Sequence, residues 1–319
     1  MTIKDALDYA TQVFLANPQI LKARFEAEIL LGNVLKKERV FLHAHSEKML
    51  DLGQKEAFFA LVDRRARNEP IEYLTNSVSF FGEVFYVDSS VLIPRPESEI
   101  LVEKVCEIIQ KQNLKSIAEI GVGSGALSIS VARACKEVHI TASDISLRAL
   151  EVAKKNIAFF GLESRINLVQ TSLLDNTKPI YPKPSPKNDT KITPKNHTKS
   201  SQKITPKSNQ KSSVDFGLDS SADFELVFSN PPYIANDYTL PPNVAYEPKE
   251  ALFGGEKGSE ILESIISLCA KREIKFLACE IGYNLAQILS PLLSANGYEA
   301  EFYNDLNGLK RGFVARLKH

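Results

Sequence analysis

The chain has 319 residues, of which 44% are hydrophobic and 24% charged, and its formal net charge is zero. This length suits two domains, and the neutral balance argues against a protein whose whole surface grips nucleic acid. The N-terminus has no apolar signal-peptide core, and no apolar run is long enough to span a membrane, so we expect a cytoplasmic protein. The four cysteines form no CxxC pair and the five histidines show no metal-ligand spacing, so we expect reduced thiols and assign no metal site.

Residues 1–72 are predicted to be helical. Apolar residues recur at helical spacing in three stretches, which contain Asp5, Phe25 and Phe58. The third stretch ends in a charged run, residues 63–67, with three arginines. Such a short basic run is only weakly specific for a polyanion, so we interpret it as a solvated helix end. The sequence therefore predicts a small helical bundle as the first domain.

Residues 73–96 are predicted to form a β-hairpin and a linker. VSFFGEVFYVD indicates two strands that fold back at Gly82-Glu83. The prolines of residues 94–96 should hold the linker extended, and a helix with acids in its first turn should follow, to about residue 112. Arg95 lies between the two prolines. Whether it only pairs with a nearby acid and positions the linker stays open at this point.

Residues 97–319 are predicted to be the second domain. From residue 115 on, strands and helices alternate, which is typical of a doubly wound parallel sheet whose ligands bind at the carboxyl ends of the strands. The predicted strands are 115–120, 138–142, 165–170, 225–229, 274–281, 297–303 and 312–317. The predicted helices are 124–135, 146–160, 257–270 and 284–295.

An insert at residues 176–222 interrupts this alternation. It consists mainly of Lys, Pro, Ser, Thr and Asn, with a lysine at every fourth position from Lys183 to Lys211, and the prolines forbid a helix. With so little apolar surface we predict disorder. Outside residues 183–211 the chain then holds 31 basic and 38 acidic residues, a net charge of −7. We favour the interpretation that the insert is a repeat expansion in a surface loop, which costs the fold little stability. The alternative hypothesis is that the insert makes a weak contact with RNA.

The stretch AEIGVGSGALSISVA, residues 118–132, predicts a strand, a glycine turn and a helix. The glycines of the turn allow a tight bend and a close approach of a ligand to the backbone, and the N–H groups that open the helix favour a negative group. The spacing departs from the dinucleotide fingerprint, so a tight turn without a ligand stays an alternative. The candidate ligand-binding residues are Gly121, Val122, Gly123, Ser124 and Gly125.

Asp144 is predicted to end the next strand, 19 residues beyond Gly125. A carboxylate there can accept hydrogen bonds from both hydroxyls of a ribose. Asp144 or Ser146 could instead cap the following helix. Together with the glycine turn, the acid favours a ribonucleoside ligand, and the absence of a P-loop lysine argues against a triphosphate.

The stretch VFSNPPYIA, residues 227–235, predicts a buried strand that runs into a rigid polar turn. Pro231 and Pro232 fix the backbone and remove two N–H donors, so the carbonyls of the turn are free for a ligand. Asn230 adds a side-chain acceptor and a donor, and Tyr233 adds an aromatic wall. This turn suits a planar group that carries an NH2, with Asn230, Pro231, Pro232 and Tyr233 as candidate catalytic and substrate-binding residues.

GVGSG, Asp144 and NPPY, in this order, resemble the Rossmann-like class I S-adenosylmethionine-dependent methyltransferases that modify amino nitrogens. Further stretches resemble one member family, the release factor glutamine N5-methyltransferases (PrmC/HemK). The stretches are ARFEAEILL, NEPIEYLTN, VLIPRPESE, YEPKEALFGGEKG and EIGYN. The resemblance spans essentially the whole chain except the insert, and the helical N-terminal part, PRPESE and NPPY occur together.

The resemblance implies a seven-stranded methyltransferase sheet with S-adenosyl-L-methionine as cofactor. Residues Gly121 to Gly125 would surround its methionine part and Asp144 would hold the ribose hydroxyls. Asn230 would lie between cofactor and substrate, and Asn230 to Tyr233 would bind the target glutamine. The sequence departs from the family in one place: Leu173 stands where a tryptophan often packs near the adenine.

The leading functional hypothesis is therefore methyl transfer to the glutamine of the Gly-Gly-Gln loop of class-1 peptide chain release factors. The resemblance implies that the N-terminal bundle would bind the body of the factor, and we expect a monomer without a membrane partner. The alternative is a DNA or RNA amino-methyltransferase acting on adenine N6 or guanine N2, because such enzymes share NPPY. That alternative needs a basic cleft, which the net charge outside the insert does not favour. A nucleoside-binding adaptor would leave NPPY unexplained.

Overall fold

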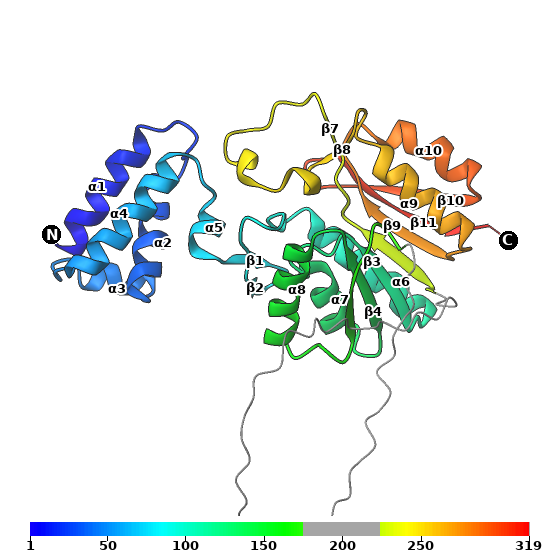
Figure 1. Ribbon diagram of the computed structural model, residues 1–319, viewed down its shortest axis with the longest axis horizontal. Helices are drawn as coiled ribbons and strands as arrows, with labels where there is room; N and C mark the ends of the chain where they lie inside the picture. The colour runs from blue at the N-terminus through cyan, green and yellow to red at the C-terminus, as the bar shows by residue number, and fades with distance from the viewer. Residues whose placement is uncertain (175–223, 319) are drawn as a thin grey trace, which may run out of the picture.

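The computed structural model describes residues 1–174 and 224–318 (Figure 1). The lysine-rich insert, residues 176–222, lies outside the described residues, as do the predictions of its disorder and its RNA contact. In the described part, a helical bundle at the N-terminus lies beside a larger α/β part that contains a seven-stranded sheet (Figure 1). This confirms the predicted Rossmann-like α/β fold class with an N-terminal helical bundle.

The N-terminal helices are closed by capping residues and packed through a shared apolar core. They are α1 (Ile3–Leu15), α2 (Ala23–Leu35), α3 (Arg39–Ala44), α4 (Leu52–Ala66) and α5 (Ile71–Thr75). Thr2 and Asp51 cap α1 and α4 in capping boxes, and Phe14, Leu30 and Phe58 are fully buried between the helices. The three predicted helices are confirmed. The short helices α3 and α5 were not predicted, because one or two turns show too little periodicity.

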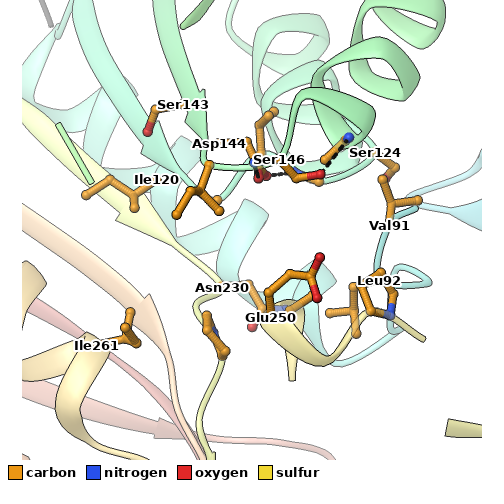
Figure 2. A pocket seen from close by; sticks show the side chains of 18 of the residues that line it. Val91, Leu92, Ile120, Ser124, Ser143, Asp144, Ser146, Asn230, Glu250 and Ile261 are labelled. Atoms are coloured by element: carbon orange, nitrogen blue, oxygen red, sulfur yellow. Dashed lines mark hydrogen bonds between the residues drawn. The ribbon is translucent and has the colours of Figure 1, made fainter. Parts of the chain in front are cut away.

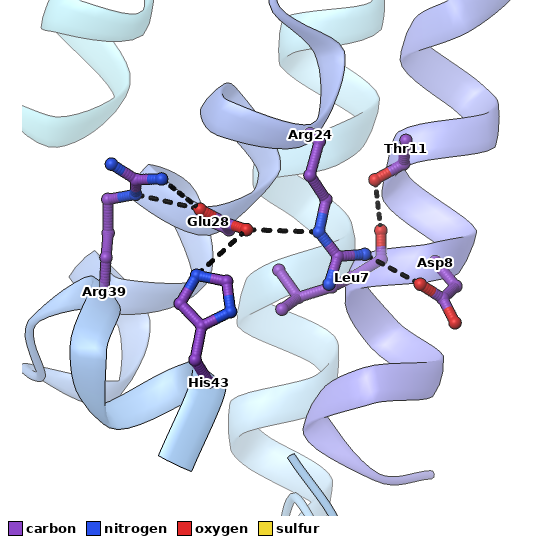
Figure 3. A network of polar contacts seen from close by, with 7 residues as sticks. All are labelled: Leu7, Asp8, Thr11, Arg24, Glu28, Arg39 and His43. Carbon is purple, nitrogen blue, oxygen red and sulfur yellow. Dashed lines mark hydrogen bonds and ion pairs between the residues drawn. The ribbon is translucent and has the colours of Figure 1, made fainter. Parts of the chain in front are cut away.

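A network of polar contacts around Glu28 crosses the bundle (Figure 3). The Glu28 carboxylate, 2% exposed, accepts hydrogen bonds from Arg24 at 3.1 Å and from Arg39 at 2.6 and 2.8 Å. Burial raises the pKa of Glu28, but the guanidinium hydrogen bonds outweigh it and hold the pKa below its ordinary value. The network thus ties α2 to α3 with a compensated buried charge.

The basic run at the end of α4 is paired with acids. Arg64 forms an ion pair with Glu69, and Arg65 forms one with Glu26 at 2.5 Å. Arg65 is only 7% exposed, so the prediction of a solvated helix end was wrong for this residue. Its side chain reaches back across the bundle to α2 and helps to fix the packing of the two helices.

The predicted hairpin forms between β1 (Val78–Phe80) and β2 (Glu83–Phe85). Its turn is one residue earlier than predicted, because Phe81 and Gly82 both adopt positive φ, of 50° and 76°. Positive φ at both central residues is the two-residue turn that matches the twist of paired strands. The Phe81 N–H donates to Glu99 at 2.8 Å, which compensates for the left-handed backbone of this residue.

The seven-stranded sheet has the order β10-β11-β9-β6-β3-β4-β5 (Figure 1). Its strands are β3 (Ser116–Ile120), β4 (His139–Asp144), β5 (Ile166–Gln170), β6 (Leu226–Ser229), β9 (Phe276–Glu280), β10 (Tyr298–Asn304) and β11 (Lys310–Leu317). All seven predicted strands are confirmed. The sheet is mainly parallel, as predicted, and β11 is the exception: it is antiparallel to both β9 and β10, because no crossover helix separates β10 from β11.

Helices cover both faces of this sheet. They are α6 (Ser98–Gln112), α7 (Ala126–Ala134), α8 (Leu147–Phe159), α9 (Glu260–Lys271) and α10 (Ala286–Ala295). Alternate residues of β6 enter opposite cores: Leu226 and Phe228 pack with α6, α7 and α8, whereas Val227 packs with α9 and α10. All four cysteines are free and buried. The carboxyl ends of the parallel strands β3, β4 and β6 lie at one edge of the sheet.

Candidate active site

The glycine turn joins β3 to α7 and is held by the neighbouring strand. The N–H groups of Gly121 and Val122 both donate to the Ser143 carbonyl, at 2.8 and 2.9 Å. Gly123 has a φ of 51°, and a Cβ at Gly121 or Gly123 would meet no atom within 4 Å. Gly125, at φ 83°, instead packs closely against Ile129. The first two glycines therefore leave open space for a ligand, while the third serves packing.

Asp144 ends β4 and faces the glycine turn. Its two carboxylate oxygens each accept one N–H, from Gly123 and from Ser146, both at 2.9 Å. Burial raises the pKa of Asp144 above its ordinary value, although these N–H donors favour the ionised form. Ser146 is the cap of α8, which decides one alternative left open by the sequence. Asp144 keeps lone pairs free for hydroxyls of a ligand.

The NPPY turn follows β6 and is pressed against a second loop. This loop contains β8 (Phe253–Gly255), which pairs with β7 (Ile234–Ala235). A Cβ at Gly254 would lie 2.5 Å from the Pro232 carbonyl oxygen, and a Cβ at Gly258 would lie 2.4 Å from the Tyr233 carbonyl oxygen. Only glycines allow this approach. The FGGEKG stretch therefore supports the turn from outside.

Two cavities meet at the NPPY turn. The larger, of about 370 Å³, is lined by Gly121 to Ser124, Asp144 and Leu173, and the smaller, of about 220 Å³, by Pro231 and Tyr233. Both volumes are of the order expected for small-ligand pockets or their subsites. Figure 2 shows the larger cavity with Asp144 and Ser146 on one side and Asn230 and Glu250 on the other. Four residues line both cavities: Leu92, Asn230, Pro232 and Ala251.

The Asn230 side chain is anchored from behind. Its Nδ2 donates to Ser98 Oγ at 3.0 Å, and Ser98 Oγ donates to Glu280 Oε2 at 2.5 Å. The other oxygen of Glu280 accepts the Tyr233 hydroxyl at 3.1 Å. Ser98 and Glu280 are each 1% exposed. Both ends of the NPPY turn thus connect to one buried carboxylate.

Arg95 forms an ion pair with Glu247, in the loop between β6 and β8. Glu247 is 4% exposed and also accepts the Ile93 N–H at 3.1 Å. The structure therefore supports the interpretation that Arg95 positions the linker against this loop. Arg95 also lines the smaller cavity, so positioning and contact with a ligand are not exclusive.

The residues present fit a nucleoside cofactor with a charged tail. The larger cavity combines a carboxylate at Asp144, turn residues whose missing side chains leave open space, and apolar walls such as Ile145 and Leu173. A flat ring system suits the apolar wall and ribose hydroxyls suit the carboxylate. Leu173 lies in this wall, where the sequence placed it, and its carbonyl accepts the Ser143 hydroxyl at 2.8 Å.

Three residues of this site were not assigned a role from the sequence. Ser98 and Glu280 stood inside the quoted stretches VLIPRPESE and EIGYN, and Glu250 inside YEPKEALFGGEKG. One signal was available, because Glu280 is a charge at the end of the apolar strand stretch IKFLACE. Such a residue at the carboxyl end of a buried strand calls for a partner or a ligand. The partner, Ser98, is distant in sequence and only the fold brings it close.

The fold and the site define a class of protein, the class I methyltransferases. A family model described as the methyltransferase small domain matches residues 96–181. Another, described as the PrmC N-terminal domain, matches residues 5–75. The fold also resembles solved methyltransferase structures, for example the hMettl16 catalytic domain in complex with an MAT2A 3′UTR hairpin. That likeness has a TM-score of 0.51 at 14% identity, covers 85% of this chain and 87% of the other, and concerns the fold alone.

Curated relatives narrow the class to one family. The release factor glutamine methyltransferase of Clostridium acetobutylicum is 33% identical, over 93% of this chain and 92% of that protein. The one of Clostridium botulinum is 32% identical, over 99% of each chain. The chain therefore belongs to the release factor glutamine methyltransferase family. Membership of this family favours the leading functional hypothesis over the nucleic-acid alternative.

The sequence predicted that no segment of the chain spans a membrane. Among residues 1–174 and 224–318, no helix combines the length and the apolar character needed to cross a bilayer.

Proposed function

We propose that this chain transfers a methyl group from S-adenosyl-L-methionine to the side-chain amide nitrogen of the glutamine in the Gly-Gly-Gln loop of class-1 peptide chain release factors. The observation that carries this proposal is the position of Asn230 and Pro232, which line both cavities at once. A group held in the smaller cavity and a group held in the larger one would face each other across these two residues.

The larger cavity is proposed to hold the cofactor. The turn from Gly121 to Gly125, including Val122 and Ser124, would contact the methionine part, and Asp144 would accept the ribose hydroxyls. Leu173 would offer its apolar side to the adenine in place of the family tryptophan. When bound, S-adenosylmethionine supplies a methyl group activated by a sulfonium.

The smaller cavity is proposed to receive the glutamine side chain. Asn230 Oδ1 and the Pro231 carbonyl can accept the two N–H groups of a carboxamide. Pro232 stiffens the turn, and Tyr233, anchored on Glu280, closes the cavity with its ring. These four residues, Asn230 to Tyr233, are the ones we assign to catalysis and substrate binding.

The chemistry explains why a stiff turn is useful. An amide nitrogen is a poor nucleophile because its lone pair is delocalised, with a rotation barrier of roughly 18–20 kcal/mol. Acceptors at both N–H groups draw charge onto the nitrogen as it pyramidalises, but each such hydrogen bond contributes only ~1 kcal/mol. Alignment of the reacting groups can supply roughly 7–11 kcal/mol. Positioning by the turn therefore dominates, and no general base is needed before transfer, because the alkylated nitrogen is strongly acidic.

Several finer points are part of the same proposal. We propose that residues 1–72 form a substrate-recognition domain, 73–96 a hairpin and linker, and 97–319 the methyltransferase domain. We further propose that the chain acts as a monomer in the cytoplasm, where release factors work. The bundle and the methyltransferase part are connected by a hydrogen bond from the Tyr246 hydroxyl to the Arg67 carbonyl at 2.9 Å, which supports a defined arrangement for a large protein substrate.

The direct test is a transfer assay with labelled S-adenosylmethionine. A release factor should accept the label, the same factor with the loop glutamine replaced by alanine should not, and DNA or RNA should not. Asn230→Ala should lower the rate of methyl transfer by at least about 100-fold, while the cofactor still binds with reduced affinity. Label in nucleic acid, or near-normal turnover of Asn230→Ala, would refute the proposal.

A further inference from the structure

A buried carboxyl group beside the turn has been described so far only as an anchor for Tyr233. Glu280 ends β9, next to β6, and is 1% exposed. It accepts hydrogen bonds from Ser98 at 2.5 Å and from Tyr233 at 3.1 Å. Burying a carboxylate at this place is costly, so a fold that keeps it there has a use for its chemical character.

The two donors and a nearby cation favour the ionised form of Glu280. Burial nevertheless holds the pKa of Glu280 above its ordinary value, although the hydroxyls of Ser98 and Tyr233 and the charge of Arg311 lower it. Arg311 is itself held by Asp305 through contacts of 2.9 and 3.2 Å. The carboxylate is thus compensated on its far side and accepts on its near side.

The direction of these hydrogen bonds fixes the orientation of the Asn230 amide. Each carboxyl oxygen of Glu280 accepts one hydroxyl, from Ser98 and from Tyr233, so Ser98 gives its single proton to Glu280. The Ser98 oxygen is then an acceptor toward Asn230, and only the amide NH2 can donate to it, as the contact of 3.0 Å from Nδ2 requires. No described residue donates to Asn230 Oδ1, which is left as the polar atom available in the two cavities.

We propose that Glu280, acting through Ser98, sets the direction of the Asn230 amide and thereby makes the site prefer a carboxamide NH2 over a carboxylate. This inference rests on the proposed function. An amide oxygen facing the substrate attracts the N–H groups of glutamine and repels the oxygens of glutamate. With the amide reversed, the NH2 of Asn230 would face the substrate and the preference would be lost. Glu280 and Ser98 are positioning residues, because neither needs to touch the substrate.

Two variants test the chain of hydrogen bonds. Glu280→Gln introduces an NH2 that can donate to Ser98, which frees the serine proton for Asn230 Oδ1 and allows the amide to turn around. Ser98→Ala removes the anchor with the loss of one oxygen atom. Tyr303→Phe is the matched control, since the Tyr303 hydroxyl is buried near Glu280 without a hydrogen-bond partner in the described chain.

The measurement is the affinity for a release factor with its Gly-Gly-Gln loop and for the same factor with Gly-Gly-Glu, both in the presence of S-adenosylhomocysteine. The wild-type protein and Tyr303→Phe should prefer the glutamine form by about tenfold or more. The glutamate form loses one hydrogen bond to Asn230 Oδ1 and places one of its own oxygens against that oxygen instead. In Glu280→Gln and Ser98→Ala the ratio should fall toward one. In Glu280→Gln, whose residue lines neither cavity, the affinity for S-adenosylhomocysteine should stay within about threefold of wild type.

An unchanged ratio in folded Glu280→Gln and Ser98→Ala would overturn the inference. If either variant fails to fold, as judged by thermal unfolding, nuclear magnetic resonance of the wild-type protein decides: one side-chain N–H of Asn230 should be protected from exchange, and protection of neither would overturn the inference. If the wild-type protein does not methylate the release factor at all, the proposed function fails instead, so the two failures are distinguishable.

Discussion

At the scale of single residues, the buried carboxyl groups near the site differ in their hydrogen-bond donors and in the cations around them. Glu119, in the central strand β3, is 1% exposed, and among the described residues it accepts hydrogen bonds only from Ser128, through its N–H at 3.1 Å and through its hydroxyl. Burial without a neighbouring cation raises the pKa of Glu119 to about 8. At neutral pH this side chain is therefore mostly protonated in the folded protein.

This raised pKa predicts a pH-dependent stability. The folded pKa lies above the ordinary value of 4.5, so the contribution of Glu119 is complete below about pH 4.5 and is lost as the pH rises toward 8. Glu119→Gln mimics the protonated form and should lose less stability over this range, by at most about 1.4 kcal/mol per pH unit. Urea unfolding of both proteins from pH 5 to 8 measures the difference, and parallel curves would contradict the assignment.

At the scale of elements, the loop with β8 shapes the NPPY turn. Gly258, at φ 80°, lies so close to the turn that a Cβ would be 2.4 Å from the Tyr233 carbonyl oxygen. Gly308 has the same φ of 80° in the turn between β10 and β11, but a Cβ there would meet nothing within 4 Å. The two glycines thus share the backbone strain and differ in the contact.

We expect Gly258→Ala to displace the turn and Gly308→Ala to leave it in place. Both variants should lose about 1 kcal/mol of stability from the left-handed backbone. Only Gly258→Ala should lower kcat, by about 100-fold, because small displacements of a positioned group are costly in turnover. Steady-state kinetics with the release factor distinguish the two, and equal kcat values would contradict the supporting role of this loop.

The linker with PRPESE is held by an ion pair between the half-buried Arg95 and the buried Glu247, and this predicts a second effect at this scale. Arg95→Ala leaves the Glu247 carboxylate buried with only the Ile93 N–H as a donor. Loss of one partner costs about 3–5 kcal/mol in a fully buried pair, and we expect less here, about 1–3 kcal/mol, because Arg95 is a third exposed and water can reach its place. Arg133→Ala is the control, because both side chains of the Arg133–Glu83 pair are more than a third exposed and such pairs contribute about 0–1 kcal/mol. Similar unfolding midpoints for the two variants would contradict a stabilising role of the Arg95–Glu247 pair.

At the scale of the whole molecule, local sequence patterns predicted the helices and strands but not the contacts between residues that are distant in sequence. Each strand of the sheet was visible because its residues alternate between two apolar cores, as Leu226, Val227 and Phe228 do. The short connection between β10 and β11 indicates that these two strands are antiparallel, but the position of β11 between β10 and β9 depends on a non-local pairing. Likewise the NPPY turn was visible in one short stretch, whereas its anchor Ser98 lies 132 residues away. The position of β11 in the sheet and the Ser98–Glu280 anchor could therefore only be seen in the folded chain.

The lysine-rich insert gives a prediction for the whole chain. Without residues 183–211 the protein carries a net charge of −7, so any contact with RNA would depend on the insert. We favour a tolerated expansion and expect deletion of residues 178–213 to leave methyl transfer unchanged, for free and for ribosome-associated release factor. Initial rates with both substrates check this. A loss confined to the ribosome-associated factor would contradict it and favour the RNA contact.

The most direct measurement is a crystal structure of the protein with S-adenosylhomocysteine and a peptide that carries the Gly-Gly-Gln sequence. The sulfur should lie in the larger cavity and the carboxamide in the smaller one, with its nitrogen within hydrogen-bond distance of Asn230 Oδ1 and directed at the sulfur. A sulfur far from Asn230, or a glutamine side chain held by other residues, would contradict the account.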